Sequence, residues 1–182
     1  SSNHTTLDSQ TISWGVHRTP FGDVLIGVIG HKLCWLSFIG KAGVEQSLCQ
    51  LMSWFGNMTI VKDEKATGGV AKMVLKLMDG SDLKIPLHFT GTDFQNRVWE
   101  VLLKVPYGER MTYGDLADSV LGVGREAARA VGGAVGANPI GYVIPCHRIV
   151  PASGGTGNYG GGKGRKKKIL AYERVRKMSI HH

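Results

Sequence analysis

The chain has 182 residues, of which 42% are hydrophobic and 20% charged, and 22 Lys and Arg against 14 Asp and Glu give a net charge of +8. This balance fits one or two folded domains and excludes a disordered chain. No stretch approaches the ~18 consecutive apolar residues of a membrane-spanning helix and no apolar signal core is present, so we expect an intracellular protein without membrane contact.

The first half of the chain predicts an α/β domain with a small antiparallel sheet. Alternating or helically spaced apolar residues predict its elements, which are strands at 12–16, 24–28 and 33–36 and helices at 44–55 and 70–78. A further alternating segment, 83–89, contains Pro86, which cannot donate a backbone hydrogen bond. We therefore expect this segment at a sheet edge.

A helical pattern replaces the alternating one after residue 90. Thr92 followed by Gln95 forms a capping box, which predicts a helix over 92–103. The change of pattern predicts two domains, 1–90 and 91–182, in a fold of the α+β class. We expect the second domain to be mainly helical and of the winged helix-turn-helix type.

The helix-turn-helix prediction rests on a second start signal in this domain. Thr112 and Asp115 open a short helix, the glycines of 122–124 break it, and 125–135 forms another helix. Short helix, glycine turn and helix match the outline of a DNA-binding helix-turn-helix. The outline alone is a weak signal, because paired helices are common in any α domain.

Positive charge is concentrated in the second domain. Residues 1–90 hold 8 basic and 7 acidic side chains, whereas 91–182 hold 14 and 7, so the net charges are +1 and +7. This asymmetry favours a polyanionic partner, with nucleic acid as the leading candidate, although basic surfaces also serve solubility alone. Eight of the basic residues lie in 163–177, where a solvated helix face is the favoured interpretation for most of them.

The predicted 125–135 helix separates an apolar face from Arg129. At ~100° per residue, one face collects six small apolar side chains, which are Ala127, Ala128, Ala130, Val131, Ala134 and Val135. Arg129 points away from this face and is expected to be exposed. It is either an ordinary solvated arginine or a nucleic-acid contact.

Cys146 and His147 interrupt an apolar run that continues to Ile149. A thiol becomes nucleophilic as the thiolate, and a nearby histidine base can take its proton. Because adjacent side chains diverge on helices and strands alike, we expect a bridging water rather than direct contact between the two. The alternative is structural, with Cys146 packed as a small hydrophobe and His147 hydrogen-bonded in the core.

Several motifs cluster between residues 91 and 173. They are Pro145-Cys146-His147-Arg148, Asn138-Pro139 before it, Gly157-Asn158-Tyr159-Gly160-Gly161-Gly162 after it, Phe94-Gln95-Asn96-Arg97-Val98-Trp99, Pro106-Tyr107-Gly108-Glu109, Thr112-Tyr113 and Ala127-Ala128-Arg129-Ala130-Val131-Gly132. Together they closely resemble the O6-alkylguanine-DNA alkyltransferases, also called methylated-DNA–protein-cysteine methyltransferases. Residues 1–90 match that family only loosely.

The resemblance implies a role for each matched catalytic position. Cys146 would accept the alkyl group as a thioether, His147 would be its water-mediated base, and Glu173 would orient His147. Asn138 would tie the helix-turn-helix to the active-site loop. Tyr113 would donate a proton to the departing guanine.

Other matched positions imply contacts with DNA and with the flipped base. Arg129 would enter through the minor groove and fill the gap left by the flipped nucleotide. The remaining DNA-binding positions are Thr112, Tyr113, Ala127 and Ala130, and the pocket positions are Tyr159, the Gly160 amide, Ile149 and Pro139. Gly141 departs from the family pattern, since some members have a proline there.

The expected activity is a single-turnover DNA repair that moves the alkyl group from O6-alkylguanine, and from O4-alkylthymine, irreversibly to the protein's own cysteine. The expected partner is double-stranded DNA bearing O6-alkylguanine, met by a monomer in the nucleus of a eukaryote or the cytoplasm of a prokaryote. No cofactor is expected. No metal is expected either, because Cys34, His31 and His88 do not reproduce the zinc ligands of some relatives.

Two other classes of protein remain as alternatives. A helix-turn-helix damage sensor or regulator would explain the basic helices but gives no role to Cys146, His147 and Glu173. A cysteine hydrolase would explain a thiol and a base but not the basic recognition helix. Incubation with O6-methylguanine DNA distinguishes the three classes. A stoichiometric gain of one methyl in the protein mass indicates transfer, and binding without modification indicates the sensor or regulator. Turnover of an ester instead indicates the hydrolase.

Overall fold

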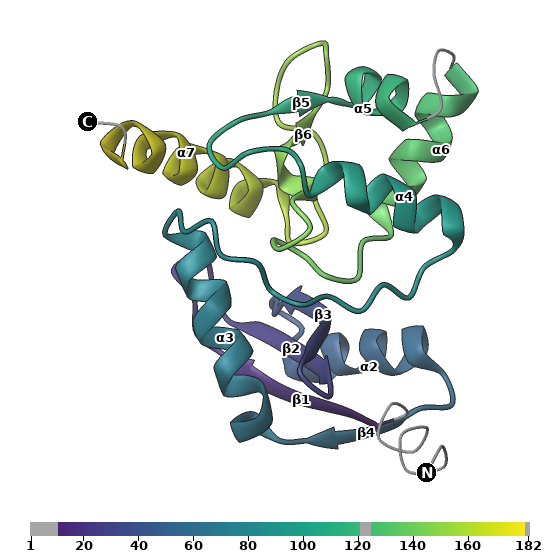
Figure 1. Cartoon of the computed structure of the whole chain (residues 1–182), viewed down its shortest axis with the longest axis vertical. Coiled ribbons are helices and arrows are strands. Elements are labelled where there is room, and N and C mark those ends of the chain that lie inside the picture. The colour runs from purple at the N-terminus through teal and green to yellow at the C-terminus, as the bar shows by residue number, and fades with distance from the viewer. Residues whose placement is uncertain (1–10, 121–124, 181–182) are drawn as a thin grey trace. The chain divides into compact units, whose positions relative to one another are not determined.

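The computed structural model describes residues 11–120 and 125–180. The chain divides into two compact units, Ser1–His88 and Phe89–His182, which are described separately below. Figure 1 labels their elements. No helix among the described residues is both long and apolar enough to cross a membrane.

The first unit is a four-stranded sheet with two helices (Figure 1). Its elements are β1 (Thr11–His17), β2 (Val24–Ile29), β3 (Lys32–Phe38), α2 (Val44–Phe55), β4 (Thr59–Lys62) and α3 (Glu64–Met78). The strand order is β3-β2-β1-β4. The first three strands pair antiparallel as expected, whereas β4 lies parallel to β1, so the sheet is mixed.

Two features of this sheet differ from the sequence expectation. β4 was not predicted, because it is only four residues long and largely exposed, so it lacks an alternating apolar pattern. The 83–89 segment forms no strand and touches the sheet edge through one parallel bridge between Leu87 and Leu33. Leu33 donates to the Pro86 carbonyl at 2.9 Å and accepts from the His88 amide at 2.9 Å, a pattern that does not require the backbone amide hydrogen that Pro86 lacks.

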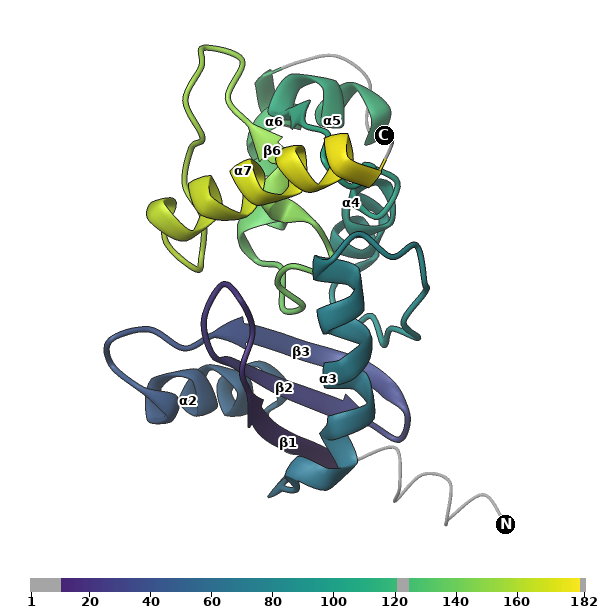
Figure 2. The ribbon, with the colours of Figure 1, turned by 90° about the vertical axis from the view of Figure 1, so that its left-hand side faces the viewer.

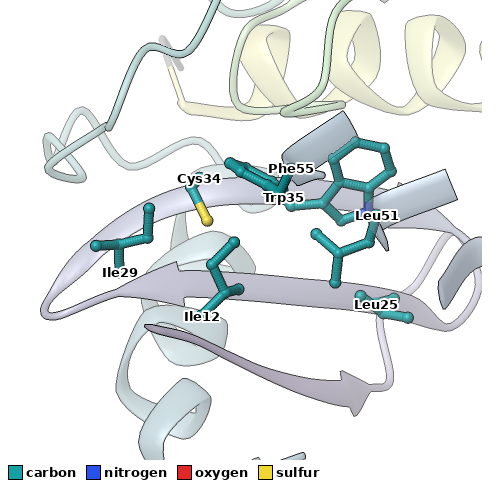
Figure 3. Packing of buried hydrophobic residues seen from close by; sticks show 7 residues of the cluster. All are labelled: Ile12, Leu25, Ile29, Cys34, Trp35, Leu51 and Phe55. Carbon is teal, nitrogen blue, oxygen red and sulfur yellow. The ribbon is translucent and has the colours of Figure 1, made fainter. Parts of the chain in front are cut away.

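The two helices cover opposite faces of the sheet (Figures 1 and 2). A buried cluster joins one face to α2 and consists of Ile12, Leu25, Ile29, Cys34, Trp35, Leu51 and Phe55 (Figure 3). Gly15 lies on the opposite face of β1, where an added Cβ would stand 2.5 Å from Thr67 Oγ1 of α3. With both faces covered, every residue of β2 is buried.

The second unit is mainly helical. Its elements are α4 (Asp93–Leu102), β5 (Met111–Thr112), α5 (Tyr113–Val120), α6 (Arg125–Gly136), the 3-10 turn η1 (Cys146–Arg148), β6 (Ile149–Val150) and α7 (Lys163–Ile180). The capping box at the start of α4 is formed, with Gln95 N donating to Thr92 Oγ1 at 3.1 Å and Thr92 N to Gln95 Oε1 at 3.0 Å. Buried Trp99 of α4 donates from its indole to the Ala134 carbonyl of α6 at 2.9 Å.

α5 and α6 occupy the positions expected for the helix pair. Thr112 Oγ1 caps α5 by accepting from Asp115 N at 3.1 Å. The expected glycine turn at 122–124 lies outside the described residues. In α6 the buried stripe is Val131, Ala134 and Val135.

The burial of α6 corrects one expectation. Ala130 is exposed rather than packed inward, because the inward stripe follows positions 131, 134 and 135 and leaves 130 at its edge. The side chain of Ala127 lies outside the described residues.

A two-stranded ladder brings distant parts of the second unit together. β5 and β6 pair in parallel, with Met111 opposite Ile149 and Thr112 opposite Val150. β6 directly follows η1, and α5 directly follows β5. The ladder therefore brings the start of α5 close to β6, the strand that follows the turn carrying Cys146.

Candidate active site

A buried carboxylate, Glu173 of α7, organises the site. It is fully buried and accepts from His147 Nε2 at 3.0 Å and from Arg148 Nε and Nη2 at 2.9 and 3.0 Å. Burial by itself raises the pKa of Glu173, but the hydrogen bonds from His147 and Arg148 outweigh it and lower the pKa to about 2. Glu173 is therefore an ionised carboxylate at neutral pH.

This carboxylate fixes the tautomer of the neutral His147 ring. A carboxylate can only accept hydrogen bonds, so Nε2 of His147 carries the proton donated to Glu173 and Nδ1 carries the lone pair. Nδ1 is buried and has no hydrogen-bond partner among the described residues. Burial lowers the pKa of His147, with the hydrogen bond and charge of Glu173 acting against it, so the neutral ring is the resting form. Nδ1 of His147 is therefore a base that can accept a proton.

Tyr142 completes the surroundings of this pair. Its hydroxyl donates to Glu173 Oε2 at 2.9 Å, and its ring stacks on that of His147 with centroids 4.9 Å apart and an interplanar angle of 10°. Its backbone is left-handed, with φ of 64°, although it is not a glycine. The surrounding contacts hold it there despite that cost.

Asn138 joins the end of α6 to the loop that carries Cys146. Its Nδ2 donates to the Ile144 carbonyl at 2.9 Å and to Cys146 Sγ at 3.2 Å, while its Oδ1 accepts from Ile140 N at 2.9 Å. Cys146 is half-buried at the first position of η1. The side-chain partner of the thiol is thus Asn138, whereas the side chain of His147 points toward Glu173.

Donors surround the sulfur of Cys146. Burial raises the pKa of the thiol, while the Asn138 hydrogen bond, the positive charge of Lys166 and two backbone amides act in the opposite direction. Lys166 is fully buried and donates from Nζ to the Ile149 carbonyl at 2.6 Å and to the Asn158 carbonyl at 3.3 Å. The resting sulfur is a protonated thiol in a setting that favours its ionised form once the proton leaves.

Tyr113 is the first residue of α5 and directly follows β5, which pairs with β6, the strand after η1. Burial raises the pKa of Tyr113, and the charge of Cys146 raises it further. The phenol is therefore within electrostatic range of the sulfur and holds its proton at neutral pH.

The expected pocket positions lie in the segments before and after η1. The Tyr159 ring lies edge-on to His147 with centroids 6.3 Å apart, Pro139 is buried and Gly160 is exposed. The carbonyl of Ile149 already accepts from Lys166, and that of Cys146 accepts from the Ile149 amide. A carbonyl oxygen has two lone pairs and can accept more than one hydrogen bond.

The expected DNA-contact positions lie on α6 and at the start of α5. Arg129 and Ala130 are exposed on α6, and Thr112 is half-buried with its hydroxyl engaged in capping α5. Arg129 therefore faces outward, as the helical angle predicts. Ala127 belongs to α6, and nothing about its side chain is described.

Three residues of the site were not assigned a role from the sequence. Arg148 was visible in the Cys-His-Arg run, but its pairing with Glu173 depends on α7 returning to η1. Lys166 was grouped with the solvated basic face of α7, whereas the structure buries it completely. Tyr142 gave no signal beyond lying in an apolar run.

Among the described residues, no group of His, Cys, Asp and Glu could hold a metal ion.

Comparison with known proteins gives concordant matches. Residues 93–175 match the family model described as 6-O-methylguanine DNA methyltransferase, DNA binding domain. A Mycobacterium tuberculosis methylated-DNA–protein-cysteine methyltransferase is 49% identical over 96 residues, or 53% of this chain and 57% of the relative, so the match spans little more than half of that relative. The inducible enzyme of that name from Bacillus subtilis is 31% identical over 153 residues, or 80% of this chain and 83% of the relative. The crystal structure of Mycobacterium tuberculosis OGT in complex with DNA matches with a TM-score of 0.75 and 34% identity, covering 90% of this chain and 94% of that chain.

Proposed function

This chain belongs to the methylated-DNA–protein-cysteine methyltransferase family, and we propose that it repairs DNA by moving the alkyl group of O6-alkylguanine onto its own Cys146. The observation that carries this proposal is the unused lone pair on buried His147 Nδ1, one residue from a thiol surrounded by donors. A damage sensor that only binds DNA has no use for this arrangement. O4-alkylthymine, which presents the same alkyl–oxygen bond, is a second substrate.

Activation begins with the thiol proton. Because the side chains of Cys146 and His147 diverge, a water carries the proton from Sγ to Nδ1 of His147. The imidazolium that forms is stabilised by the Glu173 carboxylate at 3.0 Å from Nε2. The thiolate is stabilised by the Asn138 amide and by the positive charge of Lys166.

Transfer is an in-line displacement at the alkyl carbon. The sulfur–carbon bond forms as the carbon–O6 bond breaks, and the bonding electrons pass to O6 of the guanine. Tyr113 donates its proton to the departing base and regains one from the His147 imidazolium, so the thiol proton ends on guanine. The thioether has no leaving group that this site can activate, and each molecule therefore reacts once.

The substrate base must leave the duplex to reach Cys146. Flipping costs a few kcal/mol, which phosphate contacts, stacking in the pocket and a side chain filling the vacated space offset. The exposure of Arg129 on α6 supports its assignment as the side chain that fills that space. The partner is double-stranded DNA, bound by a monomer, in the nucleus or the cytoplasm according to the cell type. The chemistry needs no cofactor.

The test is the intact mass of the protein after incubation with duplex DNA that contains one O6-methylguanine. We expect a stoichiometric gain of one methyl group, located on the peptide that contains Cys146. Cys146→Ala should gain no methyl group yet bind DNA, while Cys49→Ala, which removes an exposed thiol of the first unit, should react fully. Methylation of Cys146→Ala, or more than one turnover per molecule, would contradict the proposal.

A further inference from the structure

We propose that Tyr142 is a positioning residue that sets the basicity of His147 through two contacts, a hydroxyl bond to Glu173 and a ring stack on the imidazole. The inference rests on the proposed function only in taking His147 as the base. It deepens that function by assigning the control of the base to a residue that does not touch the substrate.

The first contact weakens the base. The Tyr142 hydroxyl donates to Glu173 Oε2 at 2.9 Å, and the same oxygen accepts from His147 Nε2 at 3.0 Å and from Arg148 Nη2 at 3.0 Å. A donor on this oxygen withdraws part of its negative charge, so the carboxylate attracts the imidazolium less strongly. The hydroxyl therefore helps to keep His147 neutral and ready to accept a proton.

The second contact strengthens the base. The rings of Tyr142 and His147 are nearly parallel, with centroids 4.9 Å apart. The face of an aromatic ring carries negative charge density and attracts a cation lying over it. Once Nδ1 takes the proton, the imidazolium gains this attraction, whereas the neutral ring gains little from it.

The left-handed backbone and burial of Tyr142 determine which substitutions can test the two contacts. It is 2% exposed and left-handed at φ of 64°, which is costly for any residue with a Cβ. Phenylalanine has the same backbone preference and ring shape, so Tyr142→Phe removes the hydroxyl and keeps the stack. Tyr142→Leu removes both contacts.

The other groups that influence this base are unchanged by these substitutions. The charged and titratable side chains around His147 are Glu173 and Lys166 of α7, Arg148 and Cys146 of η1, and Tyr159 of the following loop. A change in pH dependence between the parent and the variants is therefore assigned to the two contacts of Tyr142.

The experiment is the pH dependence of Cys146 alkylation by iodoacetamide in the full chain, followed by peptide mass spectrometry. Iodoacetamide is neutral and reacts with the thiolate. The alkylation rate rises with pH until His147 loses its own proton, and it then levels off. A more basic His147 loses that proton at a higher pH and takes the thiol proton more completely, so the plateau comes later and is higher. For Tyr142→Phe we expect this acid limb to move up by about half to one pH unit and the plateau to rise about three- to tenfold.

The ring contact is read from the second variant. Tyr142→Leu should have its acid limb and plateau below those of Tyr142→Phe, because the imidazolium loses the aromatic face. Cys49, exposed on α2, is an internal reference whose profile should be identical in all three proteins. Since Tyr142→Phe preserves the ring and the backbone, it carries the test by itself if the leucine variant does not fold.

The outcomes separate this inference from the proposed function. An acid limb that does not move in Tyr142→Phe, or a lower rate at every pH without a shift, would mean that Tyr142 only supports the fold and would overturn the inference. Methyl transfer from O6-methylguanine DNA is measured in parallel. If the alkylation profiles move as expected while the parent transfers no methyl group, the role of Tyr142 stands and the proposed substrate is wrong.

Discussion

Replacing Glu173 by glutamine tests whether one buried charge supports the second unit as well as the site. The carboxylate is fully buried and its partner Arg148 is 9% exposed. Glutamine keeps the shape but removes the charge, so the guanidinium remains ionised in a buried position without its counterion. Removing one partner of a buried pair costs ~3–5 kcal/mol. We expect the free energy of unfolding at pH 7 to fall by that amount.

The pH dependence of stability gives a second measure of the same interaction. Glu173 has its pKa lowered from 4.5 to about 2 in the folded protein, because the hydrogen bonds from His147 and Arg148 overcome the effect of burial. A carboxyl group whose pKa falls on folding stabilises the folded state above its unfolded pKa, and this stabilisation is lost as the pH falls from 4.5 toward 2. The difference between the two pKa values corresponds to ~3 kcal/mol. Protonation of Glu173 would also leave the Tyr142 hydroxyl with a neutral acceptor in place of a charged one.

The assay is urea unfolding of the full chain at neutral pH and at about pH 3, with Glu109→Gln as the matched control. Glu109 pairs with Lys177 at 3.4 Å, but its side chain is 51% exposed, so this pair contributes ~0–1 kcal/mol. The parent and the control should lose stability on acidification to about pH 3, whereas Glu173→Gln should lose ~2 kcal/mol less, because pH 3 lies above the folded pKa of about 2 and the full ~3 kcal/mol is lost only below it. A Glu173→Gln variant no weaker than the control, or equally sensitive to acid, would refute the reasoning.

Three further predictions follow from the site. Asn138→Ala removes the hydrogen bond to Cys146 Sγ and should slow methyl transfer about ten- to a hundredfold in single-turnover kinetics, with unchanged DNA affinity in a binding titration. Lys166→Met removes a positive charge near the sulfur and the bond to the Ile149 carbonyl, so the pKa of Cys146 should rise and its iodoacetamide profile should move to higher pH; an unmoved profile would contradict this. Arg129→Ala should slow transfer from duplex DNA about tenfold for each ~1.4 kcal/mol lost in flipping, while the rate with free O6-methylguanine base stays unchanged; equal loss on both would place Arg129 in support of the pocket.

Local signals in the sequence predicted the elements that depend on local chemistry. The capping box of Thr92 and Gln95 and the cap of Thr112 on α5 form as expected, because each joins residues three apart. The family motifs likewise predicted the fold class. β4 escaped prediction because its stability comes from pairing with β1, far away in sequence, and not from its own pattern.

The network around His147 could be predicted only in part. Proximity of His147 and Glu173 followed from the resemblance, but the contribution of Tyr142 depends on a left-handed backbone that no sequence pattern announces for a tyrosine. Lys166 carries the same charge as its neighbours on α7, and only the return of the loop at Asn158 makes it a buried donor. Such contacts arise from the way the loops and helices pack in three dimensions, which no local sequence pattern specifies.

The placement of Trp99 gives the protein a natural optical probe. The four tryptophans of the sequence are Trp14, Trp35, Trp54 and Trp99, so Trp99 alone belongs to the second unit. Its indole is fully buried and bonded to the Ala134 carbonyl of α6. Indole emission shifts to the red when the ring meets water. If the other three tryptophans are replaced by phenylalanine, the emission maximum of Trp99 reports whether α6 stays packed on α4 when DNA binds. No attached dye is needed.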